Sequence, residues 1–225
     1  VATIASGRTA CASSGVISGS GFAMAKITGF GAIDFTMSCV TAPLADTPRK
    51  TSQPTIASAS VRASVVDDHG VMLDTLRAAT PPTAQALEHC LDRLVGELTS
   101  RWAAKAVGLA IAGFLTPDRQ MIRFAPHLPW REARVAEEMT RRIGIPVFAE
   151  HDANSAAVAE YRFGAAARGH NSLVLAIGTG IGAGLLIDGE IYRGSFGVAP
   201  ELGHLTIVPD GRVCSCGKRG CWERY

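Results

Sequence analysis

The last stretch of the chain, GHLTIVPDGRVCSCGKRGCWERY, combines one histidine with three cysteines at short spacings. The four candidate ligands are His204, Cys214, Cys216 and Cys221. Three thiolates and one imidazole complete a tetrahedral zinc site with no open position, and a closed site of this kind is structural. Free buried cysteines or a vicinal redox pair are the alternatives. Because Cys11, Cys39 and Cys90 are scattered, the pattern indicates a metal cluster rather than a disulfide framework.

Carboxylates flank this cluster and also follow an earlier strand. Glu201 lies shortly before the histidine and Glu223 shortly after the last cysteine, so a bound metal would fix both. The segment AEHDANSAAVAEYRFG places Asp152 at a strand end, just before a helix that we expect Asn154 to cap. A carboxylate there could accept a proton from a substrate hydroxyl. The alternative is that this aspartate only caps the helix or complements its dipole.

The glycine string GTGIGAG, residues 178–184, contains part of a dinucleotide-binding fingerprint. That fingerprint requires a helix directly after the glycines, whereas LLIDGEIYRG keeps a strand pattern with its own turn. A glycine-rich turn between two strands could instead present backbone N–H groups to phosphate oxygens, with the Thr179 hydroxyl as a further donor. A tight turn that merely requires small residues is the alternative.

The elements that must position these groups alternate between strands and helices. VRASVVDDHGVMLDTL predicts a hairpin that turns at residues 67–70, and Thr80 followed by Pro81 predicts a helix start. The apolar face of that helix consists of Leu87, Leu91, Leu94, Leu98 and Trp102. AVGLAIAG, residues 106–113, predicts a strand buried on both sides.

The pattern continues with a helix over REARVAEEMTRRIG, ending at Gly144, and a short strand over PVFAE. SLVLAIG predicts another strand, and GAGLLIDGEIYRG predicts two strands around an Asp188–Gly189 turn. A hairpin followed by alternating strands and helices indicates an α/β layered architecture. Its repetition in the second half suggests two related lobes with a cleft between them.

The composition fits a cytoplasmic globular protein. The 225 residues are 47% hydrophobic and 19% charged, and 22 basic against 20 acidic residues give a net charge of +2. Without a basic run, nucleic acid is not an expected partner, and the most apolar early stretch is interrupted by Lys26 and Asp34, so no membrane span is expected. Residues 1–55 show no sustained periodicity, and we assign them no fold.

In their order along the chain, HDAN, GTGIGAG, ELGH and CSCGKRGCWE resemble the ROK family of sugar kinases and sugar-responsive repressors, particularly its glucokinase-like members. The resemblance implies an actin-like ATPase, ribonuclease-H-like fold of two α/β lobes that close on ATP with Mg²⁺ and a hexose. Residues 56–145 would form the N-terminal lobe, and residues 146–225 would start the C-terminal lobe with its structural Zn²⁺. It also implies a homodimer.

The resemblance implies a role for each matching residue. Asp152 corresponds to the catalytic base, which takes the proton from the sugar hydroxyl. The expected hexose contacts are Gly113, His151, Asp152, Glu201, His204 and Glu223. The expected phosphate-binding turn contains Gly178, Thr179, Gly180, Gly182 and Gly184. His204 would serve as zinc ligand and sugar contact at once.

The sequence departs from the family in several places. The Asp-x-Gly-Gly-Thr motif, which organises the magnesium and lets the backbone approach the phosphates, is absent, and Ala57, Ser58, Ala59 and Ser60 stand where its glycines and threonine would fall. His151 replaces a sugar-contacting asparagine. We therefore expect a fold that is incomplete at both ends, with residues 1–55 foreign to it through a shifted reading frame or a mistaken start.

These observations predict a kinase that transfers the γ-phosphate of ATP to a glucose-like hexose, although the missing motif leaves the activity of this chain open. A sugar-responsive ROK transcriptional regulator and a catalytically inactive sugar-binding remnant are the alternatives. The sequence does not name the hexose or decide between ATP and polyphosphate as the donor.

Overall fold

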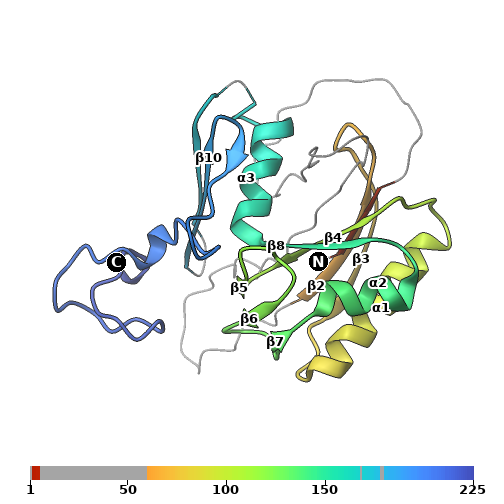
Figure 1. Ribbon diagram of the computed structural model, residues 1–225, viewed down its shortest axis with the longest axis horizontal. Helices are drawn as coiled ribbons and strands as arrows, with labels where there is room; N and C mark the ends of the chain where they lie inside the picture. Colours follow the sequence, from red (N-terminus) through yellow and green to blue (C-terminus); the bar gives the residue numbers. More distant parts are fainter. Residues whose placement is uncertain (1, 6–59, 168, 178–179) are drawn as a thin grey trace, which may run out of the picture.

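A five-stranded mixed sheet forms the larger part of the fold (Figure 1). The computed structural model describes residues 2–5, for which only the backbone is described, and 60–225, except 168 and 178–179. The strands are β1 (Ala2–Ala5), β2 (Ser60–Val66), β3 (Met72–Ala79), β4 (Val107–Ile111) and β8 (Val147–His151), and they lie in the order β3-β2-β1-β4-β8. All five residues of β4 are buried, as predicted for a strand covered on both faces.

The β2–β3 hairpin confirms the predicted turn at residues 67–70. The Asp67 carboxylate accepts hydrogen bonds from the backbone N–H groups of His69 and Val71, both at 2.9 Å. Gly70 has a φ of +80°, which a residue with a Cβ adopts at a cost. An aspartate and a glycine at these positions therefore fix the hairpin.

Helix α1 (Ala84–Thr99) packs its predicted leucine face on the sheet. Its N-cap is Thr83, whose side chain accepts a hydrogen bond from the N–H of Ala86, so the helix starts after the predicted Thr80–Pro81. We predicted Trp102 to continue the apolar face of the helix, but it lies beyond the helix end, although it packs against the same core. Its indole N–H donates to Asp74 of β3 at 3.0 Å, which fastens the segment after the helix to the sheet.

Helix α2 (Val135–Ile143) is shorter than the predicted helix, although it ends at Gly144 as expected, with φ +71°. Arg131–Ala133 forms strand β7 instead, which pairs with β6 (Ile122–Phe124), and β6 pairs with β5 (Phe114–Leu115). The predicted helix was wrong at its first residues because pairing with β6 overrides a local pattern that suits a helix. Helices α1 and α2 lie side by side against the large sheet (Figure 1).

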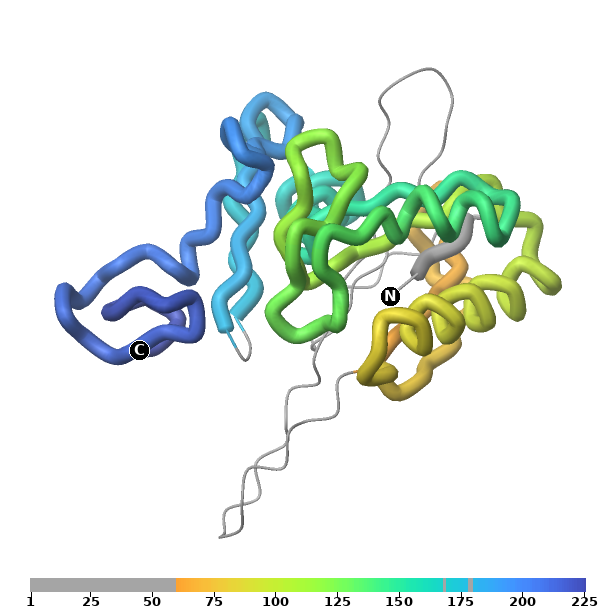
Figure 2. The backbone as a smooth tube through the Cα atoms, turned by 60° about the horizontal axis from the view of Figure 1, so that its bottom comes forward, coloured from red at the N-terminus to blue at the C-terminus, as the bar shows by residue number. Residues whose placement is uncertain are grey.

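The second half of the chain builds a smaller layer. Helix α3 (Asp152–Phe163) packs on a three-stranded antiparallel sheet of β9 (Ser172–Ile177), β10 (Ile181–Ile187) and β11 (Glu190–Ile191), in the order β11-β10-β9. The predicted Asp188–Gly189 turn is confirmed, with φ values of +50° and +80°. Two short 3₁₀ helices, η1 (Leu202–His204) and η2 (Trp222–Arg224), belong to a tail that extends away from this sheet (Figure 2).

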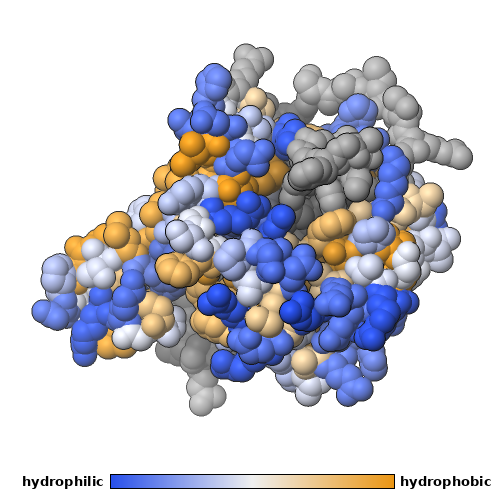
Figure 3. Space-filling view, viewed as in Figure 1, coloured by the Kyte–Doolittle hydropathy of each residue, from blue (hydrophilic) through white to orange (hydrophobic). Residues whose placement is uncertain are grey.

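One face of the smaller sheet is apolar and exposed. Leu173, Leu175 and Ile177 of β9 are 50%, 38% and 71% exposed and lie on the face opposite to the one that α3 covers. Hydrophobic residues also gather over the region of β10 in Figure 3. No helix in the part of the chain that the structure describes is long and apolar enough to span a membrane.

Strand β1 belongs to the segment for which we predicted no fold. It lies in the middle of the large sheet, parallel to β2 and antiparallel to β4. Residues 6–59, which include Ala57–Ala59 at the place of the missing motif, lie outside the described residues, and Ser60 starts β2. That residues 1–55 are foreign to the fold stays a prediction.

Candidate functional site

The junction of β8 and α3 brings together the first candidate residues. Strand β8 pairs in parallel with β4, and Ile111 is opposite His151, so both strands end at the same edge of the sheet. Asp152 is the first residue of α3, and its Oδ1 accepts the backbone N–H of Ala153 at 2.8 Å. The predicted succession of a strand end and a helix start around Asp152 is thus confirmed, with β8 ending at His151 and α3 starting at Asp152.

Asn154 does not cap α3, which corrects our prediction. The N-cap position is occupied by His151, without a side-chain hydrogen bond, and Asn154 lies inside the helix, only 1% exposed. Its side-chain amide donates to Glu150 Oε1 at 3.1 Å. The helix starts earlier than predicted because Asp152 already satisfies a free N–H of the first turn.

The carboxylates of Asp152 and Glu201 both lie close to the His151 imidazole. The His151 Nε2 lies 3.3 Å from Asp152 Oδ1 and 3.8 Å from Glu201 Oε1. Glu201 comes from the loop after β11 and has a φ of +39°, an unusual conformation for a residue with a side chain. Residues that are distant in sequence thus place two carboxylates and a histidine in one cluster.

The environment of this cluster shifts the ionisation of both carboxyls. Burial raises the pKa of Asp152, and the nearby His151 offsets part of that effect. Burial likewise raises the pKa of Glu201, against the opposing influence of His151 and His204. Buried carboxyls with a raised pKa are typical of functional sites, and a higher pKa makes a carboxylate a stronger base.

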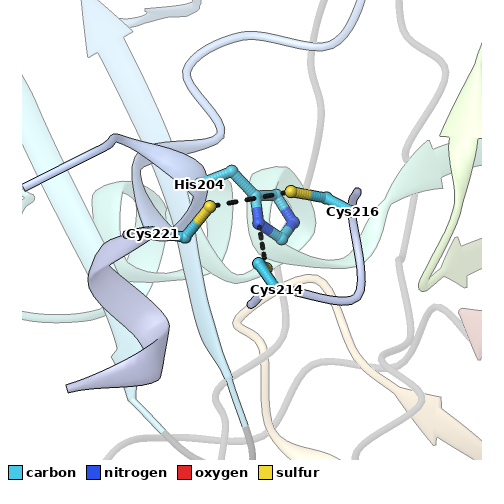
Figure 4. Close-up of side chains that lie close together, drawn as sticks. All are labelled: His204, Cys214, Cys216 and Cys221. Atoms are coloured by element: carbon cyan, nitrogen blue, oxygen red, sulfur yellow. Dashed lines mark hydrogen bonds between the residues drawn. The ribbon is translucent and has the colours of Figure 1, made fainter. Parts of the chain in front are cut away.

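The four predicted metal ligands are gathered in the tail (Figure 4). Their ligand atoms all lie within 4.8 Å of one another. His204 Nδ1 is 3.6 Å from Cys214 Sγ, and Cys216 Sγ is 3.6 Å from Cys221 Sγ. In a tetrahedral zinc site with Zn–S bonds of roughly 2.3 Å, two sulfurs lie about 3.8 Å apart. The geometry and the donor set therefore fit zinc, with four protein ligands and no position left for a substrate.

The backbone of the tail shapes this cluster. Cys214 N–H donates to the carbonyl of Lys218 at 2.9 Å, and Gly217 within that turn has φ +90°. A Cβ on Gly220, next to Cys221, would lie 1.7 Å from the Val208 carbonyl oxygen. Glycines are therefore required here by close backbone approach and positive φ.

Glu223, for which a sugar contact is predicted, lies beside two of the four possible metal ligands. Its Oε1 is 3.1 Å from Cys214 Sγ and 3.7 Å from His204 Nδ1. A Cβ built on Gly180 would meet its Oε2 at 2.8 Å, so this carboxylate also borders the glycine turn. Sugar contact by Glu223 stays a prediction.

The glycines of the predicted phosphate turn divide into two groups. Gly178 and Thr179 lie outside the described residues, and Gly180 precedes β10. Gly182 and Gly184 lie within β10, where a Cβ on Gly184 would be 2.4 Å from the Ala157 Cβ of α3. These two glycines allow α3 to approach the sheet. As the sequence indicated, a strand follows the glycines and not the helix that a dinucleotide site requires.

Gly113 lies just after β4, next to the edge where β8 ends. It is buried, and a Cβ there would be 2.9 Å from the Ala125 Cβ. Close packing therefore explains the absence of a side chain, and contact with a hexose stays a prediction.

Sequence analysis missed Glu150, a buried acid beside the cluster. Its side chain is 4% exposed and accepts hydrogen bonds from Arg193 and Asn154. A charged residue within the apolar segment PVFAE was the available signal, because such residues are rarely buried without a partner.

The mixed sheet with its flanking helices, followed by a second α/β layer, is the actin-like ATPase, ribonuclease-H-like fold. The sequence model of the ROK family matches residues 56–225, and the chain belongs to this family.

The chain is similar to proteins of two kinds. A glucokinase of Streptomyces coelicolor is 39% identical over 170 residues, which are 76% of this chain and 54% of the relative. The crystal structure of a ROK glucokinase from Streptomyces griseus, in complex with glucose and AMPPNP, aligns with a TM-score of 0.69 and 41% identity, over 74% of this chain and 53% of that one. The xylose repressor of Bacillus subtilis is 40% identical over 119 residues, 53% of this chain and 31% of the repressor. The chain thus spans about half the length of the glucokinases it matches.

Proposed function

We propose that the protein is a sugar kinase that transfers the γ-phosphate of ATP to a hydroxyl of a glucose-like hexose. The observation that carries the proposal is the meeting of Asp152, His151 and Glu201 at the end of β8. Membership of the ROK family and the likeness to two glucokinases support it.

In this proposal Asp152 accepts the proton of the attacking hydroxyl. Its carboxylate is held at the start of α3 by the Ala153 N–H, and burial gives it a raised pKa, which suits a general base. Glu201 can accept hydrogen bonds from other sugar hydroxyls, and His151 lies between the two carboxylates. Phosphoryl transfer depends mainly on such positioning of the nucleophile.

We assign the zinc a structural role. Four protein ligands would close its coordination, so the metal would fold the tail and thereby orient His204 and Glu223. The backbone N–H of His204 donates to the Glu201 carbonyl at 3.0 Å, so the same metal would also steady Glu201. Zinc in this site supplies rigidity and no reacting group.

The donor in this proposal is ATP, accompanied by Mg²⁺ as part of the substrate. The glycine turn before β10 is the proposed phosphate contact. The sequence lacks the Asp-x-Gly-Gly-Thr motif to which the resemblance assigns the organisation of magnesium, so the residues present do not provide a full magnesium site. No step of the reaction is assigned to that metal.

A coupled assay of ADP formation on the purified chain tests the proposal. Glucose, mannose, allose and N-acetylated hexoses are offered in turn, with ATP or polyphosphate as donor, and zinc is measured in the same sample. The expected result is hexose-dependent ADP formation with one zinc per chain. If no hexose is turned over with either donor, the result contradicts the proposal that this chain is a sugar kinase.

The likeness to the xylose repressor favours sugar sensing as a second function. A regulator of this kind binds a sugar without turning over ATP. Sugar-sensitive retardation of DNA together with absent ADP formation would favour this function, whereas hexose binding with neither property would indicate an inactive sugar-binding protein.

A further inference from the structure

Glu150 is the most deeply buried acid near the cluster among the described residues, and both of its oxygens are occupied. Oε1 accepts the backbone N–H of His151 at 3.0 Å and the side-chain amide of Asn154. Oε2 accepts two N–H groups of Arg193, one from Nε at 3.1 Å, and lies 3.6 Å from Arg119 Nη1. Burial alone would raise the pKa of Glu150, but its hydrogen bond and charge interaction with Arg193 lower the pKa below its usual value. The acid is therefore ionised and paired.

The two arginines come from separate loops. Arg119 belongs to the turn between β5 and β6, and Arg193 lies two residues after the end of β11. The loops also touch, because a Cβ on Gly197 would lie 3.0 Å from the Pro117 backbone. Glu150 of β8 thus contacts two separate loops, the β5–β6 turn and the loop after β11.

Arg193 stands at the start of the loop that leads to Glu201. Its carbonyl accepts the N–H of Ala199 at 3.0 Å, and the N–H of Gly197 donates to Gly194, which closes residues 193–199 into a compact loop. Pro200 and Glu201 come directly after this loop in the sequence. A residue such as Glu201, held at φ +39°, keeps that conformation only where its surroundings fix it.

We propose that the buried Glu150 and the partly exposed Arg193 and Arg119 form a clamp that positions Glu201 against His151 and Asp152. Glu150 is a positioning residue in this scheme, because it acts through the loop and not on a substrate. The consequence for hexose affinity rests on the proposed function, whereas the placement of the loop does not.

The test compares four purified variants of the whole chain: Glu150→Gln, Arg193→Met, Arg119→Met and, as a control, Arg142→Met. Arg142 is a matched control because it also joins several carboxylates, Glu88, Asp92 and Glu138, but on α1 and α2. Hydrogen–deuterium exchange is followed by mass spectrometry in peptides that cover residues 194–204 and in peptides from β4 and β9. Glucose binding is measured by calorimetry.

Exchange over residues 194–204 is expected to rise at least tenfold in Glu150→Gln and Arg193→Met, less in Arg119→Met, and not in Arg142→Met, while β4 keeps its protection. Glucose affinity is expected to fall at least tenfold in the first two variants. Because Arg193→Met leaves the buried Glu150 carboxylate without its main partner and so destabilises the chain, Glu150→Gln provides the independent measurement, since the Arg193 that it leaves unpaired has a partly exposed side chain.

Unchanged exchange over residues 194–204 in Glu150→Gln overturns the clamp, and so does a rise of equal size in β4 and β9, which marks general destabilisation. Absence of glucose binding in the wild-type chain contradicts the proposed function and not the clamp. The exchange experiment then still shows whether the clamp holds residues 194–204 in place.

Discussion

Asp152 and Asp188 are both aspartates, but their surroundings differ, so Asp188 can serve as a control for Asp152. Asp152 starts α3 beside His151, whereas Asp188 lies in the exposed β10–β11 turn. Asp152→Asn is expected to lower hexose-dependent ADP formation by about 10²–10⁴-fold, because an amide cannot accept the proton. Glucose binding should persist. Asp188→Asn keeps a residue type that tolerates positive φ and should leave the rate unchanged. Full activity of Asp152→Asn in the coupled assay would rule out the assignment of the base.

The raised pKa of Asp152 also has a consequence for stability. A folded carboxyl with a raised pKa holds its proton longer than in the unfolded chain, so the free energy of unfolding falls as pH rises from about 4, where unfolded carboxyls titrate, through the raised pKa. Asp152→Asn should flatten this part of the profile and stabilise the chain at neutral pH. Urea unfolding at a series of pH values measures the effect, with Asp188→Asn as the reference. A steeper profile in Asp152→Asn would contradict the sign.

Among the elements, we expect the tail to depend on the proposed zinc more than on apolar packing. Leu205, Ile207, Val208 and Val213 are between 38% and 60% exposed, so hydrophobic burial contributes little to its stability. Zinc removal by a chelator is expected to expose residues 205–221 to proteolysis and to abolish glucose binding, and added zinc should restore both.

Cys90→Ser is the control for the tail, since this half-buried cysteine of α1 lies outside the cluster. It should bind one zinc, whereas Cys214→Ser should lose it. A chelated chain that keeps its protease resistance over residues 205–221 would show that the tail folds without metal.

The contact of α3 with β10 depends on the absence of a side chain at Gly184. An alanine there would place its Cβ 2.4 Å from the Ala157 Cβ and 2.7 Å from the Ala153 carbonyl oxygen. Gly184→Ala should therefore destabilise the chain by about 1–3 kcal/mol and displace α3 together with Asp152.

Gly96→Ala is the control, because Gly96 is on the exposed side of α1 and a Cβ there would have nothing within 4 Å. This substitution should instead stabilise the chain by about 0.5–1 kcal/mol. Urea unfolding measures both, and equal effects would contradict the packing role.

At the scale of the whole molecule, the predictable parts are those in which local pattern and tertiary burial agree. The leucines of α1 and the apolar run of β4 are buried as their spacing indicates. The cysteine spacing predicted that the four possible metal ligands lie together, because all of them except His204 belong to one short segment.

Other features depend on contacts that no local pattern contains. The strand at Arg131–Ala133 exists because it pairs with β6, and β5 and β6 are too short to show a periodicity. The join between Glu150 and Arg193 spans distant positions in the sequence. The parallel pairing of β1 with β2 could not be inferred from a segment without a pattern.

The exposed row of Leu173, Leu175 and Ile177 on β9 has a consequence for the behaviour of the chain in concentrated solution. Apolar attraction strengthens on warming and in sulfate salts and responds little to ionic screening. Light scattering of the purified chain should therefore increase with protein concentration, temperature and ammonium sulfate, and sodium chloride should not reverse it. Leu175→Lys should scatter less light under the same conditions without altering the fold. Equal scattering of the two proteins would show that the chains associate through a surface other than this row of β9. For spectroscopy in solution, cool and dilute conditions are the expected choice.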